Sequence, residues 1–139
     1  MTLPESAKKL IRAGALGHLA TIRPDGSPRV TVIWVGVEGD DLISAHMNPQ
    51  QHKLRDVARD PRVTLSFEGS VVRPPGLNEY LVVRGTAAIE EGGAPELLQE
   101  LAEVYLGPGV KFPPMDNPPP GIRMRITVEH VGGIGPWAD

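Results

Sequence analysis

The sequence predicts a mostly β, α+β protein, a small antiparallel β-barrel of about six strands with two or three helices at its rim. Several short segments alternate apolar and polar residues with a period of two, which is typical of half-buried strands. Turn signals separate these segments, and the chain contains 16 Gly and 15 Pro, which disfavours long helices. Short strands in antiparallel runs with few helices favour a barrel.

Composition narrows the class of protein. The 139 residues are the size of one ordinary domain, so we expect a single domain over residues 1–139. No stretch approaches the roughly 20 apolar residues of a membrane span, and no secretory signal is present, so we expect a cytoplasmic protein. The absence of Cys excludes disulfides and thiolate metal sites. A net charge of −3 argues against nucleic acid as a partner.

The first 45 residues predict a helix and two successive hairpins. The expected elements are a helix at residues 5–13, strands at 17–23, 30–37 and 41–45, and turns at 24–27 and 38–40. The second strand is rich in β-branched residues and apolar on both faces, which predicts a central position in the sheet. Two hairpins in succession predict an antiparallel meander.

The remainder predicts three strands, a helix and a long loop. The expected elements are strands at 63–68, 80–89 and 122–129, loops at 71–77 and 107–121, and a helix at 95–106. Gly85 marks a bulge or a close approach of two backbones. His130 continues the apolar face of the last strand, which favours burial, with a dimer seam as the alternative. The loop at 107–121 is either a functional lid or a segment stiffened by its prolines.

A capped helix is expected between residues 48 and 60. Asn48 is a good N-cap, Pro49 suits the first helical position, and Gln51 lies where a capping box places Glu or Gln. Pro61 disfavours helical backbone at Asp60, so the helix should end there.

The faces of this helix follow from 100° per residue. They are a buried stripe of Leu54, Val57 and Ala58 and an opposite face of His52, Asp56 and Arg59. Lys53 falls at the boundary, where its stem can lie on the core while its ammonium reaches the helix N-terminus. That end carries free N–H groups and suits a phosphate. The alternative is that Lys53 extends over the rim of the barrel into solvent and binds no phosphate.

The sequence contains none of the common catalytic, metal-binding or nucleotide-binding motifs. The sequence contains no GxSxG, HExxH, GxGxxG or P-loop pattern, and its four His are not spaced as zinc ligands, so we expect no metal site. No side chain is identified as a proton donor or other catalytic group. If the protein is an enzyme, a cofactor carries the chemistry.

Two segments give a more specific indication. GHLATIRPDGSPRVTVIWV, followed after a return strand by QHKLRDVARDPRVTLSF, resembles the pyridoxamine-phosphate-oxidase-like split-barrel proteins. The chain is most similar to the actinobacterial branch that uses the deazaflavin coenzyme F420, and LVVRGTA and MRITVEHVGGIGPW also fit that branch. The resemblance covers nearly the whole chain and implies a six- to seven-stranded antiparallel split β-barrel.

The resemblance also implies a cofactor site. Its residues would be Arg29, Thr31, Val32, Ile33 and Trp34 along the ring, His46, Met47 and Asn48 at the ring and ribityl chain, Gln51, His52 and Lys53 at the phosphate, and Arg55 at the coenzyme tail. Trp137 and the loop around Phe112 would close the groove from a partner subunit. Trp34 is interpreted either as a core residue or as a ring contact.

The implied function is hydride transfer from reduced F420 to a small conjugated organic acceptor, in a homodimer with the cofactor groove between subunits. One alternative is an FMN-dependent flavoprotein of the same fold, and another is a non-catalytic binder of a flavin or haem. Arg55 and Arg59 favour the deazaflavin because its tail is anionic. The sequence departs from the family at His46-Met47-Asn48, where hydroxyl side chains are common, at Gln51 for Arg and at Asp56 for Asn.

Overall fold

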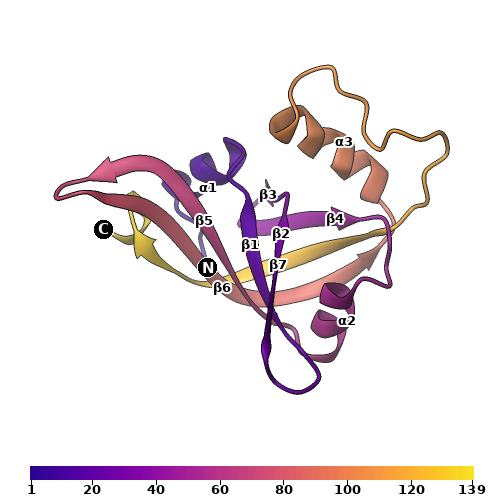
Figure 1. Ribbon diagram of the computed structural model, residues 1–139, viewed down its shortest axis with the longest axis horizontal. Helices are drawn as coiled ribbons and strands as arrows, with labels where there is room; N and C mark the ends of the chain where they lie inside the picture. Colours follow the sequence, from indigo (N-terminus) through magenta and orange to yellow (C-terminus); the bar gives the residue numbers. More distant parts are fainter.

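The computed structural model describes residues 1–139 and contains one antiparallel sheet of seven strands, in the order β2-β1-β5-β6-β7-β4-β3 (Figure 1). The elements in chain order are α1 (Glu5–Arg12), β1 (Gly17–Ile22), β2 (Pro28–Ile33), β3 (Gly36–Glu38), β4 (Asp41–His46), α2 (His52–Arg59), β5 (Arg62–Arg73), β6 (Leu77–Glu91), α3 (Ala94–Tyr105), β7 (Ile122–Ile134) and the short 3-10 helix η1 (Pro136–Ala138). The predicted fold class, a mostly β split barrel with peripheral helices, is confirmed.

The strands β2 and β3 are consecutive in the chain but stand at opposite ends of the sheet order. The prediction of a meander is therefore wrong, because the chain leaves one edge after Ile33 and joins the other edge at Gly36. The prediction that residues 30–37 form a central strand is also wrong. β2 is an edge strand, and the side chains of Val30 and Val32 are 63% and 55% exposed. The apolar outer face of β2 has no cover within this chain.

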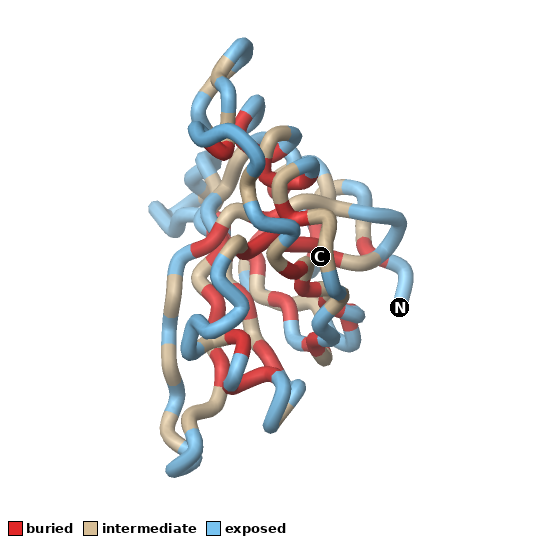
Figure 2. The backbone as a smooth tube through the Cα atoms, turned by 90° about the vertical axis from the view of Figure 1, so that its right-hand side faces the viewer, coloured by how far each residue is buried: buried red, intermediate tan, exposed pale blue.

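The main core lies between the inner faces of the strands and α1. Alternation along β5 buries Val63, Leu65 and Phe67, as the sequence predicts. A second cluster joins β4 to α3 through Ile43, Ala45 and the buried face of that helix. Figure 2 shows that buried residues follow the middle of the strands and that the hairpin tips are exposed.

A bulge changes the direction of the side chains in β7. Arg84 pairs with His130 and Gly85 pairs with Val128, so Glu129 is an extra residue in the ladder. The expected bulge at Gly85 is confirmed. The expected burial of His130 is wrong, since the extra residue turns its side chain to the exposed face.

The hairpin of β5 and β6 is longer than expected and projects from the barrel (Figure 1). The loop predicted at residues 71–77 is only a tight turn, because pairing of the two strands continues to Arg73 and Leu77. Arg73 stabilises this arm through Glu79 at 2.7 Å and Asp139 at 2.8 Å. The α1 and α3 helices form within one or two residues of their predicted bounds, and no helix is both long and apolar enough to cross a membrane.

We expect Gly85→Ala to destabilise the protein by about 1–3 kcal/mol, the usual cost of overpacking. A Cβ at Gly85 would collide with the Thr127 carbonyl oxygen, and neither backbone can move without breaking the β6–β7 ladder. Urea denaturation measures the change. Gly132→Ala is the matched control, since its Cβ would meet nothing closer than a His130 ring atom at 3.5 Å. Equal stability of the two variants would contradict the proposed constraint at the bulge.

Candidate functional site

The helix α2 begins later than predicted. It starts at His52 with Gln51 as N-cap, and no side chain caps it. Asn48 instead accepts the Gln50 N–H on its side-chain oxygen at 2.9 Å, which closes a local turn. Asn side chains commonly bond to the backbone two residues ahead, and here that turn uses the group expected to cap the helix.

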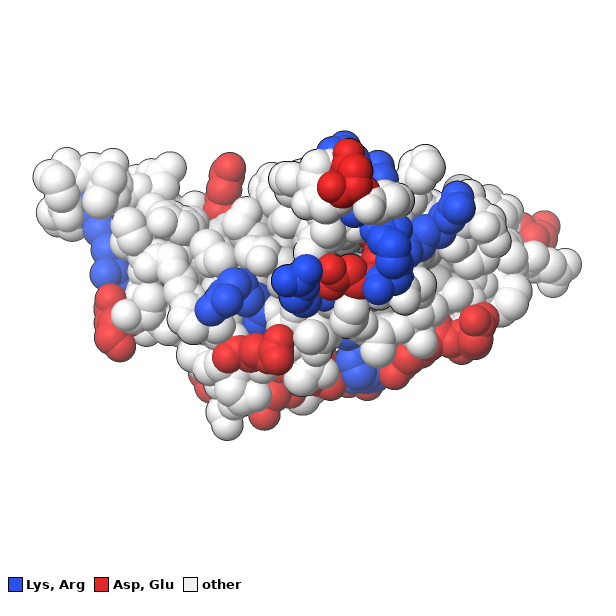
Figure 3. Space-filling view, turned by 90° about the horizontal axis from the view of Figure 1, so that it is seen from below, with Lys and Arg blue, Asp and Glu red and all other residues white.

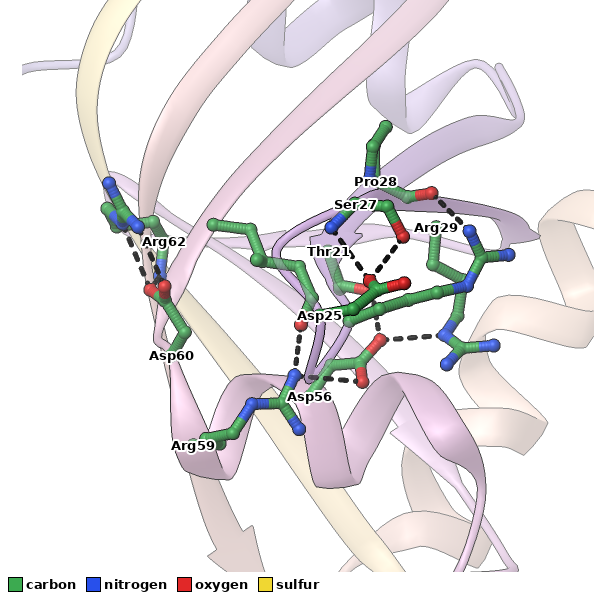
Figure 4. Close-up of polar contacts among 11 residues, drawn as sticks. Thr21, Asp25, Ser27, Pro28, Arg29, Asp56, Arg59, Asp60 and Arg62 are labelled. Atoms are coloured by element: carbon green, nitrogen blue, oxygen red, sulfur yellow. Dashed lines mark hydrogen bonds and ion pairs between the residues drawn. The ribbon is translucent and has the colours of Figure 1, made fainter.

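The buried face of α2 also differs from the prediction. Leu54 and Val57 are buried as expected, but Ala58 is exposed and the carboxylate of Asp56 is buried. Figure 4 shows Asp56 directed from α2 toward the β1–β2 hairpin. Helical periodicity places Asp56 outside, and only the contact of α2 with this hairpin provides partners that permit its burial.

Asp56 connects α2 to two strands. Its Oδ2 accepts hydrogen bonds from Thr21 Oγ1 at 2.8 Å and from Arg29 Nε at 2.7 Å, while Oδ1 accepts from Arg59 at 3.3 Å (Figure 4). Burial acts to raise the pKa of Asp56, but the hydrogen bonds from Arg29, Thr21 and Arg59 outweigh it and hold the pKa below its ordinary value. The carboxylate is therefore ionised at neutral pH and fixes Arg29 on β2.

An apolar slot of about 240 Å³ opens between the end of β2, the end of β4 and α3. Its lining is mostly hydrophobic and consists of Val32, Ile33, Trp34, Ala45, His46, Lys53, Leu98 and Phe112. Trp34 forms one aromatic wall with Phe112 tilted against it at a centroid distance of 5.3 Å. The indole packs on the α3 cluster and also lines the slot, and its contact with a ligand ring stays a prediction.

Tyr105 holds this wall in place. Its ring stacks on Trp34 with centroids 5.4 Å apart and planes inclined by 6°. Its hydroxyl donates to the Ala15 carbonyl at 2.7 Å and accepts from the Val35 N–H at 3.1 Å. The hydroxyl thereby satisfies the backbone where the chain crosses between the sheet edges, and burial raises the pKa of Tyr105.

A second hollow, of about 410 Å³, adjoins the slot and is mostly polar. It is lined by Arg23, Arg29, Val30, Thr31, Gln51, His52 and Lys53. Figure 3 views the molecule from this end and shows Lys and Arg side chains gathered at its centre, with acidic groups among them. The slot and the hollow share Lys53, whose ammonium has no ion-pair or hydrogen-bond partner in the structure.

Two ionisable groups lie where the slot and the hollow meet. Burial lowers the pKa of Lys53. Burial, and to a lesser extent the Lys53 charge, lowers the pKa of His46 to about 4, so the imidazole is neutral at physiological pH. His46 Nε2 lies 2.8 Å from the hydroxyl oxygen of Ser44, which is also buried.

Nine of the thirteen residues predicted for the site line the slot or the hollow. The four that do not are Met47, Asn48, Arg55 and Trp137. Met47 packs against the α3 cluster, Asn48 closes its turn, and Arg55 is exposed on α2. Trp137 lies in the main core of its own chain, 9% exposed, with its indole N–H bonded to the Tyr80 carbonyl. Phe112 reaches the slot from the same chain rather than from a partner.

Sequence reasoning missed three residues of the lining, the cationic Arg23 and the apolar Ala45 and Leu98. Arg23 directly precedes the predicted β1–β2 turn, so the hairpin register could have placed it near Arg29. Leu98 belongs to the predicted apolar stripe of α3, but nothing in the sequence shows which strand that stripe covers. The structure contains no group of three or more His, Asp or Glu side chains placed to hold a metal ion.

A larger hollow of about 540 Å³ lies on the outer faces of β1, β5, β6 and β7. It contains the exposed side chains of Arg62, Arg84, Glu129 and His130 and no buried polar atom without a partner. The polar hollow beside the slot differs in this respect, since Thr31 Oγ1 is buried there without a hydrogen-bond partner. A buried orphan hydroxyl beside a partnerless ammonium indicates a ligand site, which makes the smaller pair of cavities the candidate.

The geometry fits a ligand with a flat aromatic ring at one end and an anionic group at the other, as in a flavin-type cofactor. Comparison with known proteins agrees with this. Residues 3–134 match the pyridoxamine 5'-phosphate oxidase family, and the chain belongs to it. The family predicted from the motifs is thus confirmed, while a comparison with curated proteins finds no match.

Solved structures confirm the fold. An F420 reductase is 27% identical, with a TM-score of 0.74, and the match covers 93% of this chain and 98% of the reductase chain. Protein Rv2991 from Mycobacterium tuberculosis is 24% identical, with a TM-score of 0.72 over 93% of this chain and 82% of its own. General Stress Protein 26 from Bacillus anthracis is 22% identical, with a TM-score of 0.65, and the match covers 96% of this chain and 95% of its own.

We expect Asp56→Asn to lower the free energy of unfolding at pH 7 by about 1–3 kcal/mol, because Arg29 loses its charged partner. A depressed pKa stabilises the fold above the ordinary value of 3.8, and this contribution is lost as pH falls from there through the lower folded pKa. The variant should therefore lose less stability than the wild type between pH 5 and pH 3. Urea denaturation at several pH values tests this.

Asp116→Asn serves as the control for this substitution, since Asp116 is 93% exposed and pairs only with Lys111. It should leave stability unchanged at every pH. Identical acid sensitivity of the wild type and Asp56→Asn would show that the buried carboxylate does not contribute as described.

Proposed function

We propose that the protein is an oxidoreductase that binds coenzyme F420 across the slot and the hollow and passes hydride from its reduced form to a small conjugated organic acceptor. The observation that carries the proposal is the position of Lys53, which joins an aromatic-walled slot to a cationic hollow. This arrangement suits a flat ring linked to a phosphate. The family and the 27% identity with an F420 reductase support the same class of cofactor.

The residues of this chain would divide the work of binding. Trp34 and Phe112 would flank the ring and exclude water from one side. Lys53 and the terminal nitrogens of Arg29, whose Nε alone is bonded to Asp56, would hold the phosphate. The Thr31 hydroxyl would gain the partner that it lacks in the protein. The bound coenzyme supplies the hydride, and the chain orients it.

Arg23 favours F420 over FMN as the cofactor. It lines the hollow together with Arg29 and Lys53, so the hollow has one more cation than the two assigned to the phosphate, and the anionic tail of the deazaflavin would pair with it. FMN ends at the phosphate, so it has no tail to pair with the guanidinium of Arg23, whose Nη1 donates to the Pro28 carbonyl at 2.7 Å. Arg55 and Arg59, expected earlier to serve the tail, do not line the hollow, and Arg59 is bonded to Asp56 and the Ile22 carbonyl.

The proposed function is tested by titrating the protein with F420, FMN and FAD while following tryptophan fluorescence. A Trp137→Phe background leaves Trp34 as the only indole, so quenching then reports the slot directly. We expect F420 to quench Trp34 with micromolar affinity and reduced F420 to be oxidised when quinone acceptors are added. Tight binding of FMN alone would support the flavoprotein instead. Binding without turnover across the acceptor panel would support a non-catalytic carrier.

We expect Lys53→Ala to weaken F420 binding about tenfold or more, as loss of a charge-assisted contact of about 1.5–3 kcal/mol implies. The fold should persist, because the ammonium has no partner in the protein. Fluorescence titration and circular dichroism measure the two effects. Lys9→Ala on α1 is the control, since Lys9 is exposed and remote from both cavities. Unchanged affinity would contradict the proposed phosphate contact and show that Lys53 only extends over the rim of the barrel.

We further propose that the protein is a homodimer in which the partner covers the outer face of β2. Val30 lines the hollow and Val32 lines the slot, so a subunit on this exposed apolar face would lie beside the cofactor site. Val30→Lys should convert the dimer to a monomer in analytical ultracentrifugation, because charges disfavour an apolar interface. Val104→Lys, at an exposed valine on α3, should remain dimeric. A monomeric wild type would contradict this arrangement.

A further inference from the structure

A buried serine and histidine form a pair beside the slot that the binding scheme above does not use. Ser44 and His46 are two residues apart on β4, so their side chains lie on the same face of the strand. Ser44 is 1% exposed and His46 is 7% exposed. The hydroxyl oxygen lies 2.8 Å from Nε2 of the imidazole, and neither side chain has another hydrogen-bond partner in the protein.

The direction of this hydrogen bond follows from the donors available. A serine hydroxyl has one hydrogen to donate, and the only acceptor within reach of Ser44 is His46 Nε2. If Nε2 carried the imidazole hydrogen instead, the serine hydrogen would be buried without an acceptor, which proteins strongly avoid. The hydroxyl therefore donates and Nε2 accepts.

The tautomer of His46 follows from that assignment. A neutral imidazole whose Nε2 accepts must carry its hydrogen on Nδ1, since the partner of one nitrogen sets the state of the other. Nδ1 has no partner in the protein, and His46 belongs to the lining of the slot. The Nδ1–H group is thus the donor that His46 offers to a ligand.

We propose that Ser44 is a positioning residue that holds His46 as the Nδ1–H tautomer, and that His46 thereby selects ligands with a hydrogen-bond acceptor at the edge of their ring. The acceptor would be a carbonyl oxygen or an unprotonated ring nitrogen. The ligand part of this inference rests on the proposed cofactor binding, whereas the tautomer does not.

The surroundings of His46 reinforce this selection. Lys53, the other polar side chain of the slot, has an ammonium that only donates. Both polar groups at this corner are donors, so an acceptor on the ligand finds a partner there and a donor finds none. The remaining lining side chains are hydrophobic, and the one polar group among them, the indole N–H of Trp34, also only donates.

The tautomer is tested by long-range ¹H–¹⁵N NMR of the imidazole side chains in ¹⁵N-labelled protein without ligand at pH 7. The His46→Gln variant identifies the His46 signals among those of the four histidines. We expect the wild type to be protonated at Nδ1. Ser44→Ala should shift His46 toward the Nε2–H tautomer, and Ser44→Thr should restore the wild-type pattern because it returns the hydroxyl. An Nε2–H wild type, or an Nδ1–H signal unchanged in Ser44→Ala, would overturn the inference.

Ligand selection is tested by titrating the same variants with F420 and FMN. Ser44→Ala should weaken binding about three- to tenfold, the worth of one hydrogen bond, while Ser44→Thr stays within about twofold of the wild type. Ser66→Ala is the matched control, since that side chain lies on the outer face of β5 and lines neither cavity. Equal affinity of Ser44→Ala and wild type would overturn the ligand selection. Failure of the wild type to bind either compound would overturn the proposed function and leave the tautomer result standing.

Discussion

The buried carboxylate of Asp56 is the interaction on which the candidate site depends. It binds Thr21 on β1, Arg29 on β2 and Arg59 on its own helix, and so ties α2 to the β1–β2 hairpin, in which the edge strand β2 pairs only with β1. The polar hollow lies between β2 and α2, and the slot adjoins the last residues of β2 and the first turn of α2. A shift of the hairpin against the helix would separate Lys53 from Thr31 and open both cavities. The position of one charge therefore determines the shape of the site.

A second constraint acts where the chain crosses between the two edges of the sheet. Trp34 and Val35 belong to no strand, and the Tyr105 hydroxyl accepts the Val35 N–H that has no partner in the sheet. Tyr105 also stacks on Trp34, so the residue that satisfies the crossing also orients the wall of the slot. The split in the barrel and the aromatic slot thus have a common physical cause. Polar contacts hold one side of the site and aromatic packing holds the other.

Periodicity and turn chemistry in the sequence predict most of the fold. The alternation of Val63, Leu65 and Phe67 and the turn before Ser27 place their strands correctly, because each signal depends on neighbours in the chain. The prediction of a central strand at Val30 and Val32 is wrong because the place of a strand in the sheet depends on what packs against it, which is not a local property. A strand that is apolar on both faces can be covered by its own chain or by another molecule, and the pattern is the same in both cases. The prediction for His130 is wrong because the extra residue Glu129 at the bulge turns the side chains that follow it to the opposite face of the strand.

The sequence by itself determined the family, the split-barrel class, and the segments that supply the candidate site, since motifs and periodicity are local properties. Only the tertiary structure decided which of those side chains meet. Asp56 is buried, Trp137 joins the core, Arg55 remains outside, and Arg23, Leu98 and Ser44 complete the site, all through contacts between residues far apart in the chain or across a strand face. Burial and hydrogen-bond partners depend on what packs opposite a side chain, and the chain order does not contain that information.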